Sequence, residues 1–440
     1  MKTSHLIDEL AEFTAGASVG AGAGLERLAL HLADASIALM AGMRSTEGHA
    51  IAALIHRTEV SPLAHSARLA AVMRLSEIDD IHRQSAVTAS AIAVPCALAM
   101  RALAAVASPA RFIEAIFVGQ EMAVRLALAM GGTALLAQGL WPTYLVAPFG
   151  AAATTARLLG LNAARTAEAL TMALAQTPRA PGRTPRTPCP ARWALFGNAV
   201  RAGCFAALAA ADGIDGDTGL LNDTWLAGIG GAAADTTPLR GLDFASPLIA
   251  ETSIKPHCSA KQTLAALHGL RELLAQGLAA ASIDAIEVQV PGAYASMIAR
   301  EAPGVSRIAS IVSAPGQLAL AALQPESLDD VSRDALDWRG PLGAFAANIT
   351  VCAEPALDAL YPRQWPARVT VIAGQRREQI LVVDSPGDPA LPFDVVALID
   401  KATRVIGGRR GRDLVQTAMN ACRDASALEA LCHTFDVPVR

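Results

Sequence analysis

Two adjacent acids and a histidine stand out in the segment SEIDDIHRQSAVT, residues 76–88. Asp79 and Asp80 precede His82, and nearby carboxylates can orient a histidine and raise its basicity, as a general acid or base requires. Ser76 and Asp79 also have the Ser-x-x-acid spacing of a capping box, in which the acids would only stabilise a helix start. The sequence leaves both interpretations open.

A lysine, a histidine and a thiol crowd the segment SIKPHCSAKQ, residues 253–262, where a helix is predicted to begin. A lysine just ahead of a helix N-terminus faces the positive end of the helix dipole, which favours its neutral form. Lys255 is therefore a candidate base, with Lys261 close behind it. His257 and Cys258 are candidate site residues, although a capping residue and a core thiol are the simpler interpretation.

Aromatic residues are scarce, with 5 Trp and 3 Tyr in the chain, yet Trp141 and Tyr144 occur together in GLWPTYLVAPFGAAA, residues 139–153. They stand at the expected start of a helix of small residues. Two roles are open for such rings: they can wall a cleft, or the tyrosine hydroxyl can take part in chemistry.

A proline-rich segment, TPRAPGRTPRTPCPARW at residues 177–193, contains four arginines, among them Arg183 and Arg192. Guanidinium groups bind carboxylates through paired hydrogen bonds, and functional residues favour loops that a rigid scaffold holds. An anion-recognition loop and an ordinary solvated loop are both compatible with this composition.

The composition excludes several classes of protein. With 52% hydrophobic and 17% charged residues, the 440-residue chain is predicted to be globular, and its net charge of -4 gives no basic surface for nucleic acid. Proline and arginine interrupt the alanine-rich stretch at residues 86–106, which indicates a buried helix and no membrane span. Seven cysteines without paired spacing and an acidic N-terminus predict a cytoplasmic protein with reduced thiols and no metal site.

Common cofactor and nucleophile motifs are absent from the sequence. It contains no GxGxxG after a strand, no GxxxxGK[ST], no GxSxG and no HExxH. Nicotinamide, nucleotide, serine-hydrolase and zinc-protease chemistry are therefore poorly supported.

The elements that would position these residues fall into two groups. Helical periodicity dominates residues 5–230, whereas IDAIEVQV at 283–290 alternates as a strand and residues 368–383 read as a hairpin around Gly374. From residue 395 onward the pattern is helical again. We predict a mostly α fold, in which residues 1–250 and 396–440 form a large all-helical domain. Residues 251–395 are predicted to form a smaller α+β domain with an antiparallel sheet.

Taken in order, five segments resemble the MmgE/PrpD family, which includes 2-methylcitrate dehydratase, cis-aconitate decarboxylase and iminodisuccinate epimerase. They are EIDDIH, GLWPTYLVAPFGAAATTARLLGL, RWALFGNAVRAG, IKPHCSAKQ and SPGDPALP. The resemblance covers nearly the whole chain. It implies a homodimer with a cleft between two domains and no metal or organic cofactor. It also implies proton removal next to a carboxylate of a small di- or tricarboxylate.

The chain departs from the family pattern at three histidines and one lysine. One family histidine falls at Val87 or Thr88, and that of the Gly-x-His-Pro segment is replaced by Trp141. Ala260 stands where a further histidine follows the retained Lys255, with His257 and Lys261 nearby, and Arg192 replaces a lysine. Guanidinium keeps the positive charge but does not titrate in the working range.

These departures favour an epimerase or isomerase of iminodisuccinate type, with Tyr144 and Lys255 as the proton-transfer pair. Neighbouring cations could lower the pKa of Tyr144 far enough for it to act as a base. A dehydratase or decarboxylase that uses His82 or His257 is the alternative, and a catalytically silent carboxylate-binding member is the second. The predicted substrate-binding residues are Asp79, Asp80, Thr88, Trp141, Arg183, Arg192 and Lys261.

Overall fold

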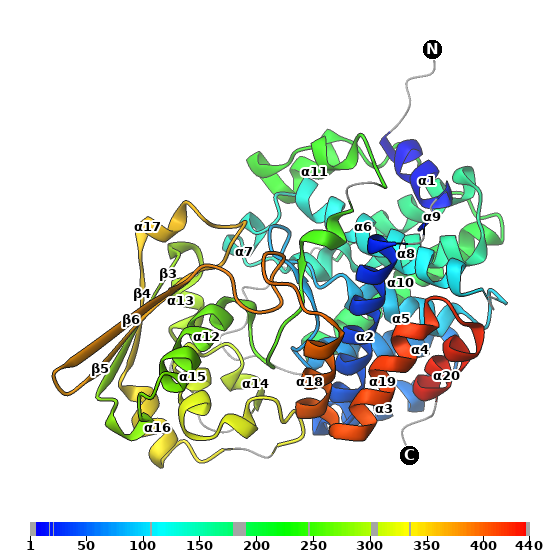
Figure 1. Cartoon of the computed structure of the whole chain (residues 1–440). Coiled ribbons are helices and arrows are strands. Elements are labelled where there is room, and N and C mark those ends of the chain that lie inside the picture. The colour runs from blue at the N-terminus through cyan, green and yellow to red at the C-terminus, as the bar shows by residue number, and fades with distance from the viewer. Residues whose placement is uncertain are drawn as a thin grey trace.

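The computed structural model describes residues 6–16, 18–20, 22–105, 108–178, 191–244, 247–300, 307–333 and 336–436. Most of them are helical, and the longer strands gather in one part of the chain. Figure 1 shows a large helical body beside a smaller part in which helices pack on a sheet. This is the fold class that the sequence predicts.

The helical body is built from both ends of the chain. The C-terminal helices α18 and α19 pack against α2 near the N-terminus, and α20 contacts α5 (Figure 1). The helices of this body are α1 Leu6–Gly16, α2 Ala23–Met43, α3 Thr46–Thr58, α4 Pro62–Leu75, α5 Ser90–Met100, α6 Pro109–Ala129, α7 Ala134–Ala137, α8 Pro142–Leu159, α9 Ala163–Ala175, α10 Ala191–Ala211, α11 Asp223–Gly230, α18 Val395–Ile406, α19 Gly408–Ala421 and α20 Ala425–Asp436.

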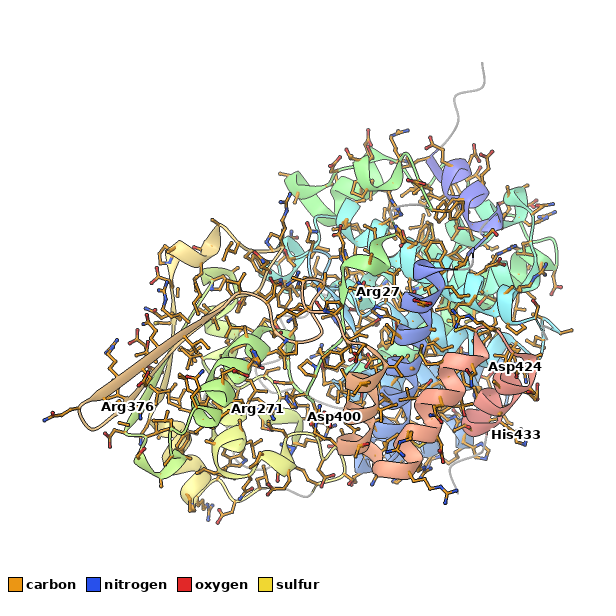
Figure 2. The ribbon with its side chains drawn as sticks, in the orientation of Figure 1. Arg27, Arg271, Arg376, Asp400, Asp424 and His433 are labelled. Atoms are coloured by element: carbon orange, nitrogen blue, oxygen red, sulfur yellow. The ribbon has the colours of Figure 1, made fainter. Side chains whose placement is uncertain are left out.

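The smaller part is built on a four-stranded sheet in the order β4-β3-β5-β6. Strands β5 (Ala367–Ala373) and β6 (Arg376–Val382) form the predicted hairpin, with Gly374 at φ 60° and Arg376 at its tip (Figure 2). Strand β3 (Ala285–Val290) is antiparallel to β5, as expected, whereas β4 (Ile349–Ala353) adds a parallel edge. A parallel partner requires a crossover, and several helices between β3 and β4 supply it.

Helices pack on this sheet and complete its core. Gly269 of α12 (Lys261–Ala275) lets the helix approach Val369 and Val382, and α15 (Ala314–Leu323) packs against α12 and β4. The other helices of this part are α13 Gly292–Ile298, α14 Arg307–Ser310, α16 Pro341–Ala347 and α17 Pro355–Asp358.

Helix α10 lies between α4, α8 and α9 and packs closely on two of them through glycines. A Cβ atom on Gly197 would lie 2.3 Å from the Ala67 carbonyl oxygen, and one on Gly203 would lie 2.0 Å from that of Pro148. Among the described residues, α10 alone is long and apolar enough to cross a membrane, but 56% of its apolar window is buried in the protein. Core helices of this kind pass the same test.

Replacing Gly203 with alanine is expected to destabilise the protein. Overpacking costs about 1–3 kcal/mol, which exceeds the gain of up to about 1 kcal/mol that alanine brings to a helix. We expect a net loss of about 1–2 kcal/mol in the free energy of unfolding, measured by urea denaturation. Gly228→Ala in α11 is the control, because no atom lies within 4 Å of the added Cβ. Equal losses in the two variants would contradict this packing.

Candidate active site

A two-residue ladder joins the helical body to the smaller part. Strand β1 (Ile81–His82) pairs antiparallel with β2 (Thr252–Ser253), and Ile81 faces Ser253. Counting two residues further along this register brings Asp79 opposite Lys255. The Lys255 Nζ atom indeed lies 3.2 Å from Asp79 Oδ1, although 176 positions separate the two residues. The pairing therefore unites two of the segments that the sequence analysis singled out.

The capping-box interpretation of Ser76 and Asp79 is wrong. Helix α4 ends at Leu75, and Ser76 follows as its C-terminal cap, with its hydroxyl donating to the Met73 carbonyl at 2.7 Å. The chain then turns through Glu77, at φ 56°, and extends into β1. No helix starts here for the acids to stabilise, so Asp79 is presented from a loop.

The prediction that Lys255 faces the positive end of a helix dipole is wrong. Helix α12 begins only at Lys261, and the groups next to the Lys255 ammonium are carboxylates. Glu77 Oε2 lies 3.8 Å from Nζ, in addition to the Asp79 contact, and Lys255 is only 2% exposed. Lys255 is thus a buried member of an ion cluster.

Arg74 completes this cluster from the last turn of α4. Its Nη1 atom lies 2.9 Å from Glu77 Oε2 and 3.2 Å from Asp79 Oδ1. The sequence alone does not single out Arg74, because a lone arginine in a helical segment resembles a surface residue. Its spacing of three and five residues from two acids was the available signal.

The two carboxylates of the cluster differ in their protonation. Burial opposes ionisation of Glu77, but the charges of Arg74, Lys255 and Arg192 outweigh it and lower the pKa of Glu77 to about 2. Burial raises the pKa of Asp79, and the charges of Arg74 and Lys255 only partly offset this. Glu77 is therefore a fixed anion, whereas Asp79 can carry a proton. Divergent carboxylate environments of this kind are typical of acid–base sites.

Asp79 also has an unused oxygen. Arg74 and Lys255 both donate to Oδ1, while Oδ2 is buried and has no hydrogen-bond partner among the described residues. A buried acceptor without a partner is costly, and it marks a position that a proton, water or ligand can fill.

Two aromatic rings and a second arginine adjoin this ion cluster. The Trp141 ring lies 5.5 Å from Arg74 Cζ and 4.3 Å from Arg192 Cζ, at distances typical of cation–π contacts. Its centroid is 5.9 Å from that of Tyr144, and the two rings are stacked. The Trp141 side chain thus holds Arg192 close to the acids. The structure brings Asp79 and Lys255 together, and Arg74 links them to Trp141 and Arg192. Tyr144 joins this group through its contact with Trp141.

Tyr144 is half-buried, and burial raises its pKa, whereas the sequence predicted that neighbouring cations would lower it. Among the described residues that prediction is wrong, and a role for Tyr144 as a base is not supported. Its hydroxyl is therefore protonated at neutral pH. Arg183, which was expected to supply positive charge here, lies outside the described residues. Its contribution stays a prediction.

The family was determined by comparison with known proteins. The model of the MmgE/PrpD N-terminal domain matches residues 10–239, just over half of the chain. The chain belongs to the MmgE/PrpD family. The matched region contains Asp79, Trp141, Tyr144 and Arg192, and ends before Lys255. No match was found among curated proteins. MmgE/PrpD proteins are generally enzymes, so membership supports an enzyme without defining its reaction.

Asp80 is held in a closed hydrogen-bond network on the other side of the MmgE/PrpD acidic segment. Its carboxylate contacts His31 Nδ1 at 2.9 Å and accepts from the Ser90 backbone nitrogen at 3.2 Å. Successive side chains of an extended chain point to opposite sides, which separates Asp80 from Asp79. Thr88 donates its backbone N–H to Thr143 Oγ1, and its own hydroxyl oxygen is buried without a partner in the described structure.

The two candidate histidines are engaged elsewhere to different extents. The ring of His257 lies between Asp329, 3.0 Å from Nδ1, and Arg271 of α12, which contacts Nε2. Both of its ring nitrogens are occupied. His82 Nδ1 lies 2.9 Å from Ser85 Oγ, whereas its buried Nε2 has no hydrogen bond within the described structure.

Lys261 is bound to the late Gly-Asp-Pro turn. Its Nζ atom lies 2.8 Å from Asp388 Oδ1 and 2.9 Å from Ser385 Oγ. Burial lowers the pKa of Lys261, and the Asp388 charge opposes that shift. This contact ties α12 to the turn near Ile254, whose N–H donates to the Gly387 carbonyl.

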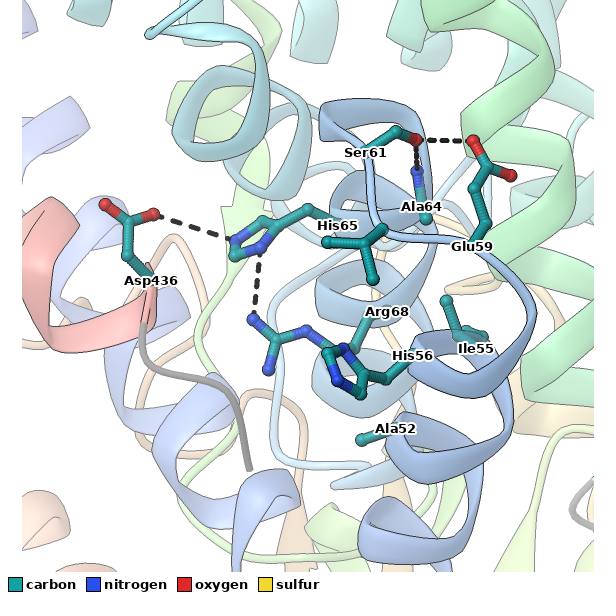
Figure 3. A pocket seen from close by; sticks show the side chains of 10 residues that line it. Ala52, Ile55, His56, Glu59, Ser61, Ala64, His65, Arg68 and Asp436 are labelled. Carbon is teal, nitrogen blue, oxygen red and sulfur yellow. Dashed lines mark hydrogen bonds and ion pairs between the residues drawn. The ribbon is translucent and has the colours of Figure 1, made fainter. Parts of the chain in front are cut away.

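A separate pocket of about 120 Å³ opens near the start of α4 (Figure 3). It is lined by His56, His65, Arg68 and Asp436, and burial lowers the pKa of His65 to about 4. At 1.5 Å per residue along the helix, His65 is roughly 14 Å from Arg74. Within the described residues, no group of three or more metal-ligating side chains is present there or elsewhere.

Glu77→Gln is expected to destabilise the protein at neutral pH. Lowering a carboxyl pKa from 4.5 to about 2 corresponds to about 3 kcal/mol of stability. A depressed pKa contributes stability above the unfolded value, and this is lost as the pH falls towards about 2. Urea denaturation should therefore show a difference from the unaltered protein that is largest at pH 7 and narrows below pH 4.5. The exposed Glu12→Gln is the control, and a difference that widens in acid would contradict this assignment.

Proposed function

We propose that this protein is a cofactor-independent enzyme that removes a proton next to a carboxylate of a small di- or tricarboxylate, as an epimerase of iminodisuccinate type. The observation that supports this best is the buried Lys255–Asp79 pair, because Asp79 has both a raised pKa and an unused oxygen. The proposal assigns the first proton transfer to Lys255 and the second to Tyr144.

Asp79 can prepare Lys255 to act as a base. Proton transfer from the Lys255 ammonium to Asp79 leaves a neutral amine and a carboxylic acid, and burial favours the uncharged form of the acid. The amine then takes the α-proton of the substrate. Proton abstraction of this kind requires an acceptor placed by fixed contacts, which Arg74 and Glu77 provide around Lys255.

The cations of the site suit an anionic substrate and its enolate-like intermediate. Arg74 and Arg192 flank Trp141, and preorganised charges stabilise developing negative charge more strongly in a buried site than in water. Tyr144 then gives a proton to the opposite face of the α-carbon. Its raised pKa keeps that proton available at neutral pH. The resulting phenolate is reprotonated from solvent, and Asp79 releases to solvent the proton that it took from Lys255, which restores the starting state.

A lyase of the 2-methylcitrate dehydratase or cis-aconitate decarboxylase type is the alternative. Elimination of water needs an acid for the leaving hydroxyl, and His257 is a poor candidate because Asp329 and Arg271 occupy both ring nitrogens. His82 Nε2 has no hydrogen bond among the described residues, and its ion-pair contact is with Glu251 Oε2 at 3.8 Å, not with Asp79. These contacts favour the epimerase.

The proposal also includes a homodimer, which analytical ultracentrifugation tests.

Incubation with small dicarboxylates in deuterated water is expected to place deuterium at the α-carbon and to invert its configuration. Mass spectrometry and chiral chromatography measure the two events. The molecular formula should change only by the label. Loss of water or carbon dioxide would support the lyase, and binding without any turnover would support a catalytically silent carboxylate-binding protein.

Substitutions of the two proposed proton-transfer residues should have different effects on the reaction. Lys255→Met is expected to lower exchange of the α-proton by about 100-fold or more, the usual contribution of a general base. Tyr144→Phe should retain that exchange for the enantiomer that Lys255 deprotonates but lose inversion. Tyr361→Phe, in the smaller part of the protein, is the control. Inversion at the full rate in Tyr144→Phe would leave Trp141 and Tyr144 as walls of the site only.

A further inference from the structure

The loop that presents Asp79 is anchored by residues outside the ion cluster. It runs from the end of α4 to β1, and its backbone carbonyls accept hydrogen bonds from several directions. Cys258 Sγ donates to the Ser76 carbonyl at 2.9 Å, and Lys401 Nζ donates to the Ile78 carbonyl at 2.8 Å. The Ile78 contact is the one next to Asp79 in the chain.

Lys401 reaches this carbonyl from the C-terminal helix α18. Its side chain is fully buried and forms an ion pair with Asp34 of α2. Asp34 lies three residues after His31, which binds Asp80, so both side chains lie on one face of α2. Helices α2 and α18 therefore hold the residues on either side of Asp79, while Asp79 itself turns towards Arg74 and Lys255.

Stability alone is a weak explanation for a buried pair of this kind. Desolvation offsets most of the attraction between two buried charges, and well-packed apolar residues are often at least as stabilising. The cost is visible at Asp34, where burial raises the pKa to about 6 and Oδ2 has no partner within the described residues. What an apolar pair could not do is donate a hydrogen bond to the Ile78 carbonyl.

We infer that Asp34 and Lys401 are positioning residues for the reaction, because they fix the Ile78 carbonyl and thereby the direction of the Asp79 side chain. The inference rests on the proposed function in that Asp79 acts on Lys255. Asp34 orients Lys401, Lys401 holds the backbone, and neither touches the substrate. A displacement of about 1 Å in a reacting group can lower the rate about 100-fold, so a small movement of this loop is sufficient.

The test removes the pair together, so that no unpaired buried charge remains. In Asp34→Asn/Lys401→Met, kcat should fall by about 100-fold while KM changes little, because the cations that bind carboxylate are intact. Hydrogen–deuterium exchange at residues 76–82 should become faster. Thermal unfolding shows that the variant is folded.

Arg68→Met is the matched control. Arg68 is also a buried cation that joins the helical body to the C-terminal chain, and it donates to the Phe435 carbonyl at 3.1 Å. Phe435 and another neighbour of Arg68, His65, both lie outside the Asp79 loop. It should leave kcat and exchange at residues 76–82 unchanged. A folded double variant with kcat or loop exchange like the unaltered protein would overturn the inference, as would an equal kcat loss in Arg68→Met.

The outcome separates this inference from the proposed function. If the unaltered protein neither exchanges nor inverts any dicarboxylate, the proposed function fails. Loop exchange in the double variant still decides whether Asp34 and Lys401 anchor residues 76–82, because that measurement requires no turnover.

Discussion

The ion pair between Lys255 and Asp79 is the interaction on which the site depends. Each partner comes from a different part of the fold, and a two-residue strand pairing brings them into register. Because Lys255 is buried, separating the two parts would leave its charge without Asp79 and Glu77, whereas Asp79 would keep Arg74. Losing the partners of a buried charge costs far more than losing a surface pair. The same contact therefore joins the two parts of the fold and forms the centre of the site.

Around this pair, charge is distributed unequally between two neighbouring acids. Three cations outweigh burial at Glu77 and lower its pKa, while burial outweighs the neighbouring cations at Asp79 and raises its pKa. The difference arises from position alone, since the two side chains have the same functional group. Trp141 extends the arrangement by stacking with Arg192, so a residue without titrating groups still determines where positive charge lies.

The sequence was sufficient to predict the helices, the hairpin at Gly374 and the family, because these depend on local periodicity and on ordered motifs. It could not predict that Asp79 faces Lys255, since strands of two residues carry no periodic signal. The capping-box interpretation of Ser76 was wrong because its spacing to Asp79 is typical of a helix start, whereas its hydroxyl in fact donates to the preceding turn. Lys401 resembled the polar face of an amphipathic helix, and only tertiary packing buries it.

The origin of the helical body from both chain ends has a consequence during synthesis. Asp34 and its partner Lys401 are separated by 367 positions, so the ribosome makes the acid long before the base. At about 5–20 residues per second, the interval is roughly 20–70 s. During this interval, Asp34 in the nascent chain has not yet met Lys401, its counter-ion. The surface of α2 that contacts α18 and α19 is also uncovered. The packing of the last tenth of the polypeptide therefore completes the helical body. A chain released before that part is made lacks α18 and α19, the helices that pack against α2.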